Sequence, residues 1–192
     1  MEREVIVTGI GGQGIQLMAK VLAQAANRTG KQVMLFGIYG GMMRGGSSES
    51  TVVVSDEAIL APPIIPHTWS VLAMHPMGLA EVAAKLRPGG VLCVNSTLVH
   101  RVPRDDVQLL QIPATRMAEQ AGTIMGAGMI ALGAFCAATR LVDHQAVLAA
   151  MREALPPHRQ QLAEMNVQLL NQGADFINQR HASPATNHEP RP

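Results

Sequence analysis

The sequence predicts a single Rossmann-like α/β domain, with a mostly parallel sheet flanked by helices and a helical C-terminal part. Three observations support this class. A β-branched segment runs directly into a glycine cluster at residues 5–14, which read VIVTGIGGQG. Apolar segments typical of buried strands then alternate with helical ones as far as residue 112, and only helical patterns follow. The length of 192 residues suits one domain, for which about 100–200 residues is usual.

The N-terminal segment predicts a strand–helix–strand unit. Apolar residues recur at helical spacing over residues 15–27, directly after the glycine cluster. Gly30 is well placed to end this helix, because glycine adopts the left-handed conformation without steric cost. Residues 32–36 form the strand that completes the unit. The glycine turn is then expected to face a ligand or a partner, since N–H groups at a helix start favour negative charge.

The glycine turn does not match a P-loop. That motif requires Lys and then Ser or Thr after its last glycine, whereas Gly14 is followed by Ile15 and Gln16. Hydrolysis of ATP or GTP by this loop is therefore disfavoured.

The dinucleotide fingerprint is only partly met. Gly9, Gly11 and Gly14 have its spacing, but the motif also needs an acidic residue about 20 positions later to hold the ribose. The second strand instead ends in Leu35-Phe36-Gly37-Ile38-Tyr39, which carries no carboxylate. Binding of NAD by this chain alone is disfavoured. Glycines that serve close helix–sheet packing are the structural alternative.

A second glycine-rich loop is expected over residues 39–50, before an apolar strand at residues 51–54. Arg44 stands between glycines and can present its guanidinium fork to a carboxylate or phosphate. The hydroxyls of Ser47 and Ser48 can support the same ligand. An arginine that is merely solvated on a loop explains the pattern equally well.

The middle of the chain keeps the α/β alternation. Residues 70–74 predict a buried strand, and residues 76–86 a helix that begins with proline. A turn is expected at residues 87–90, and two further strands at residues 91–94 and 107–112. Polar residues follow two strand ends, where open α/β sheets bind ligands; they are His75, Asn95, Ser96 and Thr97. A lone histidine at such a position is more often structural than functional.

The last third of the chain predicts helices over residues 114–121, 126–139, 143–154 and 160–172. Asp143 is the expected N-cap of its helix, and Gly173 is the expected end of the last one. Residues 181–192 are polar and proline-rich, so a disordered tail is expected there.

The composition excludes several classes of partner. The formal charge is +1, which offers no electrostatic basis for binding nucleic acid or a membrane surface. Charged residues make up 15% of the chain, against a usual share of about 25%. Part of the surface is therefore expected to be covered by other subunits.

The cysteines and the hydrophobic segments indicate a cytoplasmic protein without its own metal centre. Cys93 and Cys136 are isolated, so no zinc site or iron–sulfur cluster can be built from local motifs. No signal peptide is expected, because Glu2, Arg3 and Glu4 lead directly into the first strand. The apolar segment at residues 125–138 is too short to span a bilayer.

Several motifs together resemble the gamma subunit, or gamma domain, of the 2-oxoacid:ferredoxin (acceptor) oxidoreductases. The most diagnostic is Gly9-Ile10-Gly11-Gly12-Gln13-Gly14. Further matching positions are Tyr39-Gly40, Arg44-Gly45-Gly46, Ser55-Asp56, Ile59, Pro62, Gly133, Asn166 and Gly173. The resemblance covers about residues 3–178, so residues 1–180 are expected to form one gamma-type domain. One position departs from the family loop, since Met42 stands where a glutamate is usual.

The resemblance implies a subunit of a larger enzyme that oxidatively decarboxylates a 2-oxoacid to acyl-CoA and carbon dioxide. In this family, thiamine diphosphate lies between alpha-type and beta-type subunits. Iron–sulfur clusters lie in the beta-type and ferredoxin-like delta-type parts, and some complexes add a flavin subunit that passes electrons to NAD. This chain is then expected to hold no catalytic residue and no cofactor of its own, and to border the coenzyme A site.

Two loops are the expected contacts to coenzyme A. Gly9, Gly11, Gly12, Gln13 and Gly14 would offer N–H groups and an amide to its pyrophosphate. Arg44, Gly45, Gly46, Ser47 and Ser48 would meet another phosphate or the substrate carboxylate. Three alternatives stay open: loops that only contact partner subunits, a scaffold module without a ligand, and a free-standing nucleotide-binding oxidoreductase.

Overall fold

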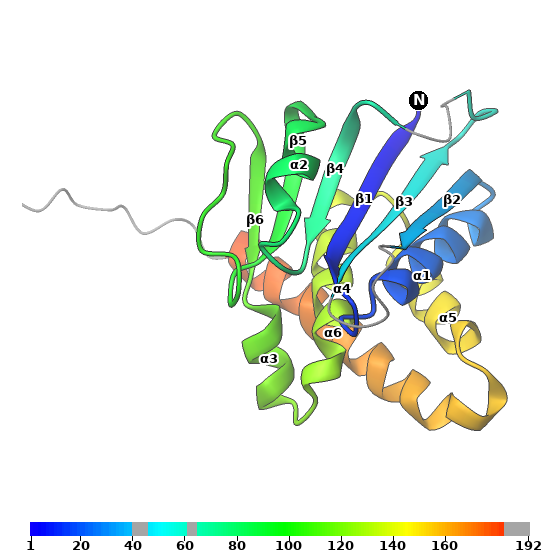
Figure 1. The fold of residues 1–192 in the computed structure, drawn as a ribbon. Helices are drawn as coiled ribbons and strands as arrows, with labels where there is room; N and C mark the ends of the chain where they lie inside the picture. Colours follow the sequence, from blue (N-terminus) through cyan, green and yellow to red (C-terminus); the bar gives the residue numbers. More distant parts are fainter. Residues whose placement is uncertain (40–45, 61–64, 183–192) are drawn as a thin grey trace, which may run out of the picture.

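The computed structural model describes residues 1–39, 46–60 and 65–182. In these ranges the chain forms a six-stranded sheet in the order β2-β3-β1-β4-β5-β6 (Figure 1). The strands are β1 (Arg3–Ile10), β2 (Gln32–Tyr39), β3 (Ser47–Ser55), β4 (Thr68–Ala73), β5 (Leu86–Asn95) and β6 (Gln108–Ile112).

The sheet is mostly parallel, as predicted. β1, β4, β5 and β6 pair in parallel, whereas β3 runs antiparallel to both of its neighbours, β1 and β2. The prediction that β2 directly completes a unit with β1 is wrong, because β3 lies between them. A short connection joins β2 to β3, and such a connection favours an antiparallel hairpin. β3 therefore occupies the place beside β1 that β2 would otherwise take.

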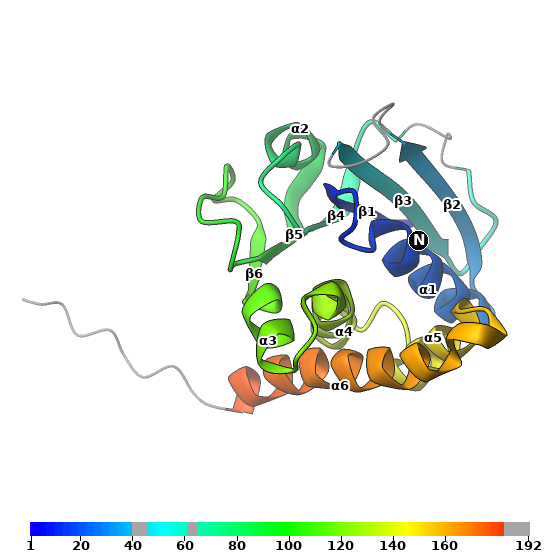
Figure 2. The ribbon, with the colours of Figure 1, turned by 60° about the horizontal axis from the view of Figure 1, so that its bottom comes forward.

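Helices cover both faces of the sheet unequally. They are α1 (Ile15–Arg28), α2 (Leu79–Ala84), α3 (Ala114–Gln120), α4 (Ala127–Thr139), α5 (His144–Ala154) and α6 (Gln160–Ala182). Figure 2 shows α2 alone on one face and the other helices on the opposite face, with α6 outermost against α4. Asp143 caps α5 as predicted, because its side chain accepts a hydrogen bond from the Ala146 N–H at 3.1 Å.

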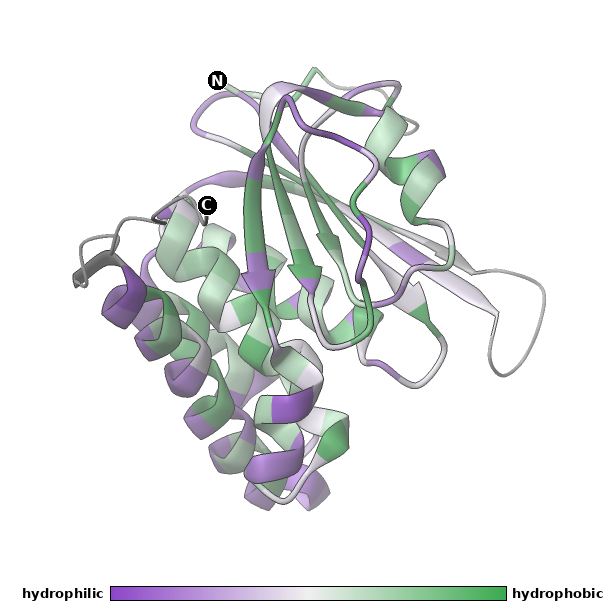
Figure 3. Ribbon diagram, turned by 90° about the vertical axis from the view of Figure 1, so that its left-hand side faces the viewer, coloured by the Kyte–Doolittle hydropathy of each residue, from purple (hydrophilic) through white to green (hydrophobic). Residues whose placement is uncertain are grey.

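The hydrophobic core lies mainly between the sheet and the helical layer formed by α1 and α4. Alternate residues of one strand contribute to different faces: Val5 and Val7 pack toward α1 and α4, whereas Ile6 packs toward α2. Figure 3 shows hydrophobic residues concentrated in the strands and in the helices between the sheet and the outermost helix. In the described ranges, no helix combines the length and apolar character needed to cross a membrane.

Two predicted boundaries in the middle of the chain are wrong. The helix expected over residues 76–86 is shorter, since it begins after Gly78, whose φ of 77° places it in the left-handed region. The turn expected at residues 87–90 belongs to β5 instead. β5 pairs Leu86 with Thr68 and then Val91 with Ser70, so an irregularity in the ladder accommodates these residues.

The last helix does not end at Gly173 as predicted. α6 continues to Ala182, because Gly173 serves a close crossing with α4 rather than a helix end. A Cβ atom at Gly173 would overlap the main-chain oxygen of Ile130, and one at Gly133 would overlap that of Leu170. Of the tail expected at residues 181–192, the first two residues end α6 and the remainder lies outside the described residues.

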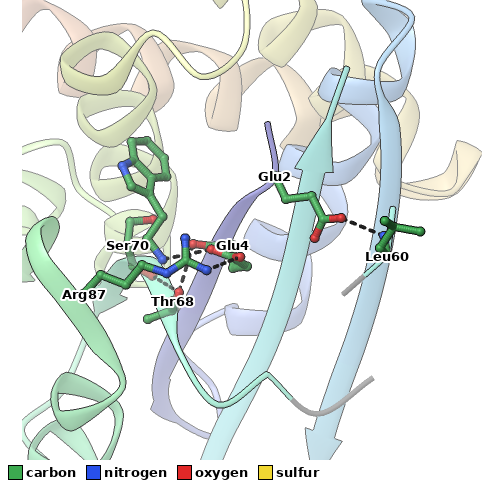
Figure 4. A network of polar contacts seen from close by, with 7 residues as sticks. Glu2, Glu4, Leu60, Thr68, Ser70 and Arg87 are labelled. Atoms are coloured by element: carbon green, nitrogen blue, oxygen red, sulfur yellow. Dashed lines mark hydrogen bonds and ion pairs between the residues drawn. The ribbon is translucent and has the colours of Figure 1, made fainter. Parts of the chain in front are cut away.

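A buried carboxylate joins three strands at the amino edge of the sheet (Figure 4). Glu4 is only 4% exposed, and Arg87 donates to its Oε1 at 2.7 Å while the Trp69 N–H donates to its Oε2 at 3.1 Å. The Thr68 hydroxyl lies 2.9 Å from the Glu4 carbonyl oxygen. These contacts fix β1, β4 and β5 at the edge opposite the glycine turn.

Candidate functional site

The glycine turn joins β1 to α1 at the carboxyl edge of the sheet. Gly12 and Gly14 have φ angles of 98° and 75°, a conformation that other residues rarely adopt. Gly14 is the N-cap of α1, and the described residues supply neither a side-chain cap nor an acidic residue in the first turn. The first-turn N–H groups therefore present the positive end of the helix dipole without a neutralising charge.

The side chain of Gln13 is engaged within the protein. Its Oε1 accepts a hydrogen bond from the Ile10 N–H at 3.0 Å, and its Nε2 lies 3.4 Å from the Met74 carbonyl oxygen at the end of β4. A Cβ atom at Gly9 would lie 2.8 Å from Ile15 Cδ1 and 3.1 Å from Met74 Cβ. Gly9 and Gln13 therefore close the turn against the sheet, which supports the packing role for these two residues.

The structure brings the two predicted loops together. The Gly11 N–H donates to the Gly46 carbonyl oxygen at 3.1 Å. Ser47 and Ser48 pair with Ile10 and Gly9 in the β1–β3 ladder. The prediction of a loop through residue 50 is therefore wrong, because β3 begins at Ser47. Arg44, Gly45 and the unusual Met42 lie outside the described residues.

The start of α2 borders this junction from the other face of the sheet. A Cβ atom at Gly78 would lie 3.6 Å from Ser47 Oγ and 3.9 Å from Thr8 Oγ1. Thr8 is fully buried, and its hydroxyl has no hydrogen-bond partner among the described residues. Met77, which is 46% exposed, lies in the adjacent turn. The backbone of the glycine turn, the hydroxyls of Thr8 and Ser47, and Met77 therefore all lie at one edge of the sheet.

The polar residues predicted at the strand ends are engaged in hydrogen bonds within the protein. His75 Nδ1 accepts a hydrogen bond from the Met77 N–H at 3.1 Å, so it orders its own turn. The Ser96 N–H donates to the Ile112 carbonyl oxygen at 2.8 Å, and Thr97 Oγ1 accepts from the Arg116 N–H at 3.3 Å. These contacts support the structural interpretation of His75.

Glu49 is a carboxylate near the site that the sequence interpretation did not single out. It pairs with Thr8 across the β1–β3 ladder, and its side chain is only 17% exposed. Burial raises the pKa of Glu49, the Lys85 ammonium 4.0 Å away lowers it, and Glu81 raises it again. No local pattern marks this carboxylate, because residues 47–51 are all polar and show no alternation of apolar and polar positions.

Glu49→Gln is expected to flatten the pH dependence of stability. A carboxyl whose pKa is raised on folding binds a proton more tightly in the native state, so the free energy of unfolding falls as the pH rises from about 4.5 through the folded pKa. In the glutamine variant the free energy of unfolding does not decrease over this pH range. The variant is therefore expected to be more stable than the unmodified protein above the range. Urea unfolding between pH 4 and pH 8 measures the effect. Parallel stability profiles for the two proteins would contradict the assignment.

The described residues contain no group of three or more His, Cys, Asp or Glu side chains that could hold a metal ion. Cys93 and Cys136 are both buried. Burial raises the pKa of the Cys136 thiol to about 12, so this thiol stays protonated near neutral pH.

Comparison with known proteins decides the family. The model of the pyruvate ferredoxin/flavodoxin oxidoreductase family matches residues 4–176. The chain belongs to this family. Among the oxidoreductases it resembles, the 2-oxoglutarate synthase subunit KorC of Methanothermobacter marburgensis is 31% identical, over 92% of this chain and 97% of that protein. The ketoisovalerate oxidoreductase subunit VorA of the same organism is 29% identical over 91% of this chain, which corresponds to only 36% of VorA.

Solved oxidoreductase structures share the fold. The gamma subunit of a keto/oxoacid ferredoxin oxidoreductase from Geobacter sulfurreducens is 30% identical, with a TM-score of 0.78 over 92% of this chain and 99% of that one. A 2-oxoglutarate:ferredoxin oxidoreductase from Magnetococcus marinus has a TM-score of 0.82 at 18% identity, over 93% of this chain and 31% of that one. The family membership predicted from the glycine motifs is confirmed, and the α/β fold is confirmed with it.

Proposed function

We propose that this chain is the gamma-type subunit of a cytoplasmic 2-oxoacid:acceptor oxidoreductase complex, which converts a 2-oxoacid to acyl-CoA and carbon dioxide. The names of its relatives support this proposal, since they are subunits of 2-oxoglutarate, ketoisovalerate and pyruvate oxidoreductases. The partners would be alpha-type and beta-type subunits that hold thiamine diphosphate, together with a ferredoxin-like delta-type subunit or a flavin subunit. Those partner cofactors supply the decarboxylation and electron-transfer chemistry.

The role proposed for this chain is to border the coenzyme A site. The observation that carries it is the junction between Gly11 and Gly46, which brings the two glycine-rich segments together at one edge of the sheet. The uncapped start of α1 follows the first segment on one face, and the Ser47 hydroxyl lies beside the start of α2 on the other. N–H groups at a helix start and serine hydroxyls are suitable donors for phosphate oxygens. The Magnetococcus marinus relative was solved with coenzyme A and succinyl-CoA bound, which is consistent with such a ligand in this fold.

A scaffold role without a ligand is the second candidate. The observation that favours it is the engagement of Gly9 and Gln13 in packing and internal hydrogen bonds. Two observations disfavour a free-standing nucleotide-binding oxidoreductase. The end of β2 carries no carboxylate that could hold a ribose, and β3 rather than β2 lies beside β1.

Ser47→Asp is expected to raise the Michaelis constant for coenzyme A about fivefold in the assembled complex. A carboxylate at this exposed position would lie near the phosphates, and one unit charge some 6 Å away is worth about 1 kcal/mol at intermediate dielectric constants. Steady-state kinetics of 2-oxoacid oxidation at varied coenzyme A measures the effect.

Two controls separate charge from general damage. Ser47→Asn keeps the size of the new side chain without its charge and is expected to change this constant far less. Gln161→Glu places the same charge on the exposed start of α6, remote from the junction, and is expected to leave the constant within about twofold. An unchanged constant in Ser47→Asp would favour the scaffold role instead.

A further inference from the structure

Asn95 is a fully buried amide at the carboxyl end of β5, and both ends of its side chain are bonded. Its Oδ1 accepts a hydrogen bond from the Thr115 N–H at 3.2 Å, at the start of α3. Its Nδ2 lies 2.8 Å from Thr115 Oγ1 and 3.3 Å from the Met74 carbonyl oxygen. The side chain therefore bridges the ends of β4 and β5 to the first turn of α3.

The carbonyl oxygen of Met74 receives a second amide from the glycine turn. Gln13 Nε2 lies 3.4 Å from it, and Gln13 Oε1 accepts a hydrogen bond from the Ile10 N–H at 3.0 Å. A continuous chain of hydrogen bonds thus runs from Ile10 through Gln13, Met74 and Asn95 to Thr115. It crosses the lower ends of β1, β4 and β5 in Figure 1 and ends at α3.

We propose that Asn95 is a positioning residue for the glycine turn. By donating to the Met74 carbonyl oxygen while its own oxygen is held by Thr115, it fixes the acceptor on which the Gln13 amide closes the turn. Asparagine is suited to this position because its amide donates and accepts at once, whereas an ionised aspartate would present only acceptors to the Met74 oxygen. Burial makes the loss of the Asn95 amide costly, because the Met74 carbonyl oxygen then keeps only the Gln13 amide as a side-chain partner, and the effect is expected to reach the glycine turn through Gln13.

Backbone amide exchange in the full-length chain tests this proposal directly. Asn95→Ala is expected to speed exchange of the Ile10 N–H at least about tenfold, which corresponds to about 1.4 kcal/mol of lost protection. Exchange of the Val147 N–H, which bonds the Asp143 carbonyl oxygen in the distant α5, is expected to change less than about twofold. Equal acceleration at Ile10 and Val147, or none at Ile10, would overturn the proposal.

A matched variant separates positioning of the turn from capping of α3. Thr115→Val removes the hydroxyl partner of Asn95 and keeps the bonds to Met74 and to the Thr115 N–H. It is expected to leave exchange at Ile10 close to that of the unmodified chain. Acceleration equal to that of Asn95→Ala would show that Asn95 acts only on α3, and would overturn the proposal.

The unmodified chain offers a test that does not depend on the folding of any variant. The side-chain amide protons of Asn95 and Gln13 are expected to exchange more slowly with solvent than those of Asn178, which is exposed on α6. Exchange of the buried Asn95 amide or the half-buried Gln13 amide at the rate of Asn178 would contradict the chain of hydrogen bonds.

The consequence for coenzyme A rests on the proposed function. In the assembled complex, Asn95→Ala is expected to raise the Michaelis constant for coenzyme A several-fold while kcat changes little, because the variant loosens a binding turn and touches no reacting group. Faster exchange at Ile10 with an unchanged Michaelis constant would support the positioning role of Asn95 and count against the coenzyme A site alone.

Discussion

Gly133→Ala is expected to lower the free energy of unfolding by about 2 kcal/mol. The added methyl group would overlap the main chain of α6 at Leu170, where α4 and α6 pack together. A clash with a side chain could be relieved by rotation of that side chain, whereas a clash with the main chain forces the two helices apart. Overpacking of this kind costs about 1–3 kcal/mol or more. The better helix propensity of alanine returns only about 1 kcal/mol. Urea unfolding followed by circular dichroism measures the difference.

Two further glycines make this prediction specific. Gly173→Ala is expected to cause a similar loss, because its methyl group would overlap the main chain of α4 from the opposite side of the same crossing. Gly126→Ala is the control, since its nearest neighbour is the end of the Leu169 side chain rather than backbone. A loss at Gly126 as large as that at Gly133 and Gly173 would show that backbone approach is not the cause.

Arg87→Ala is expected to lower the free energy of unfolding by about 2 kcal/mol. The substitution leaves the Glu4 carboxylate buried with only the Trp69 N–H to satisfy it. An uncompensated buried charge is strongly destabilising, although the exposure of the arginine, at 48%, keeps the expected loss below that of a fully buried pair. The same unfolding experiment measures it.

Arg28→Ala is a closely matched control for Arg87→Ala. Its guanidinium is similarly exposed, at 43%, and its partner Glu153 lies at 2.8 Å, but that carboxylate is 59% exposed. A surface pair of this kind contributes about 0–1 kcal/mol. The comparison isolates the burial of the carboxylate, so equal losses in the two variants would contradict the role assigned to Glu4.

Local sequence signals predicted most elements of the fold, because they depend on neighbours along the chain. The glycine turn, the N-cap at Asp143 and the alternation of strands and helices are signals of this kind. The place of β3 between β1 and β2 is not, since strand order is decided by pairing over the whole sheet. The same limit explains Gly173, which has the local character of a helix end but serves a contact with Ile130 in another helix.

In the candidate site, too, the sequence predicted features that depend on neighbouring residues but not those that depend on distant contacts. The sequence identified both glycine-rich segments, and the structure places Gly11 against Gly46. It could not show that the Gln13 amide is directed at Met74, 61 residues away, rather than outward to a ligand. Glu49 was missed because its burial depends on β3 extending further than its serines suggested.

Native mass spectrometry of the chain purified with its cellular partners tests whether it acts as a subunit of a 2-oxoacid oxidoreductase complex. We expect a defined complex in which this chain is bound to subunits that carry thiamine diphosphate and iron–sulfur clusters. The isolated chain is expected to show no turnover. A chain that stays free of such subunits and binds NAD tightly by itself would contradict this role.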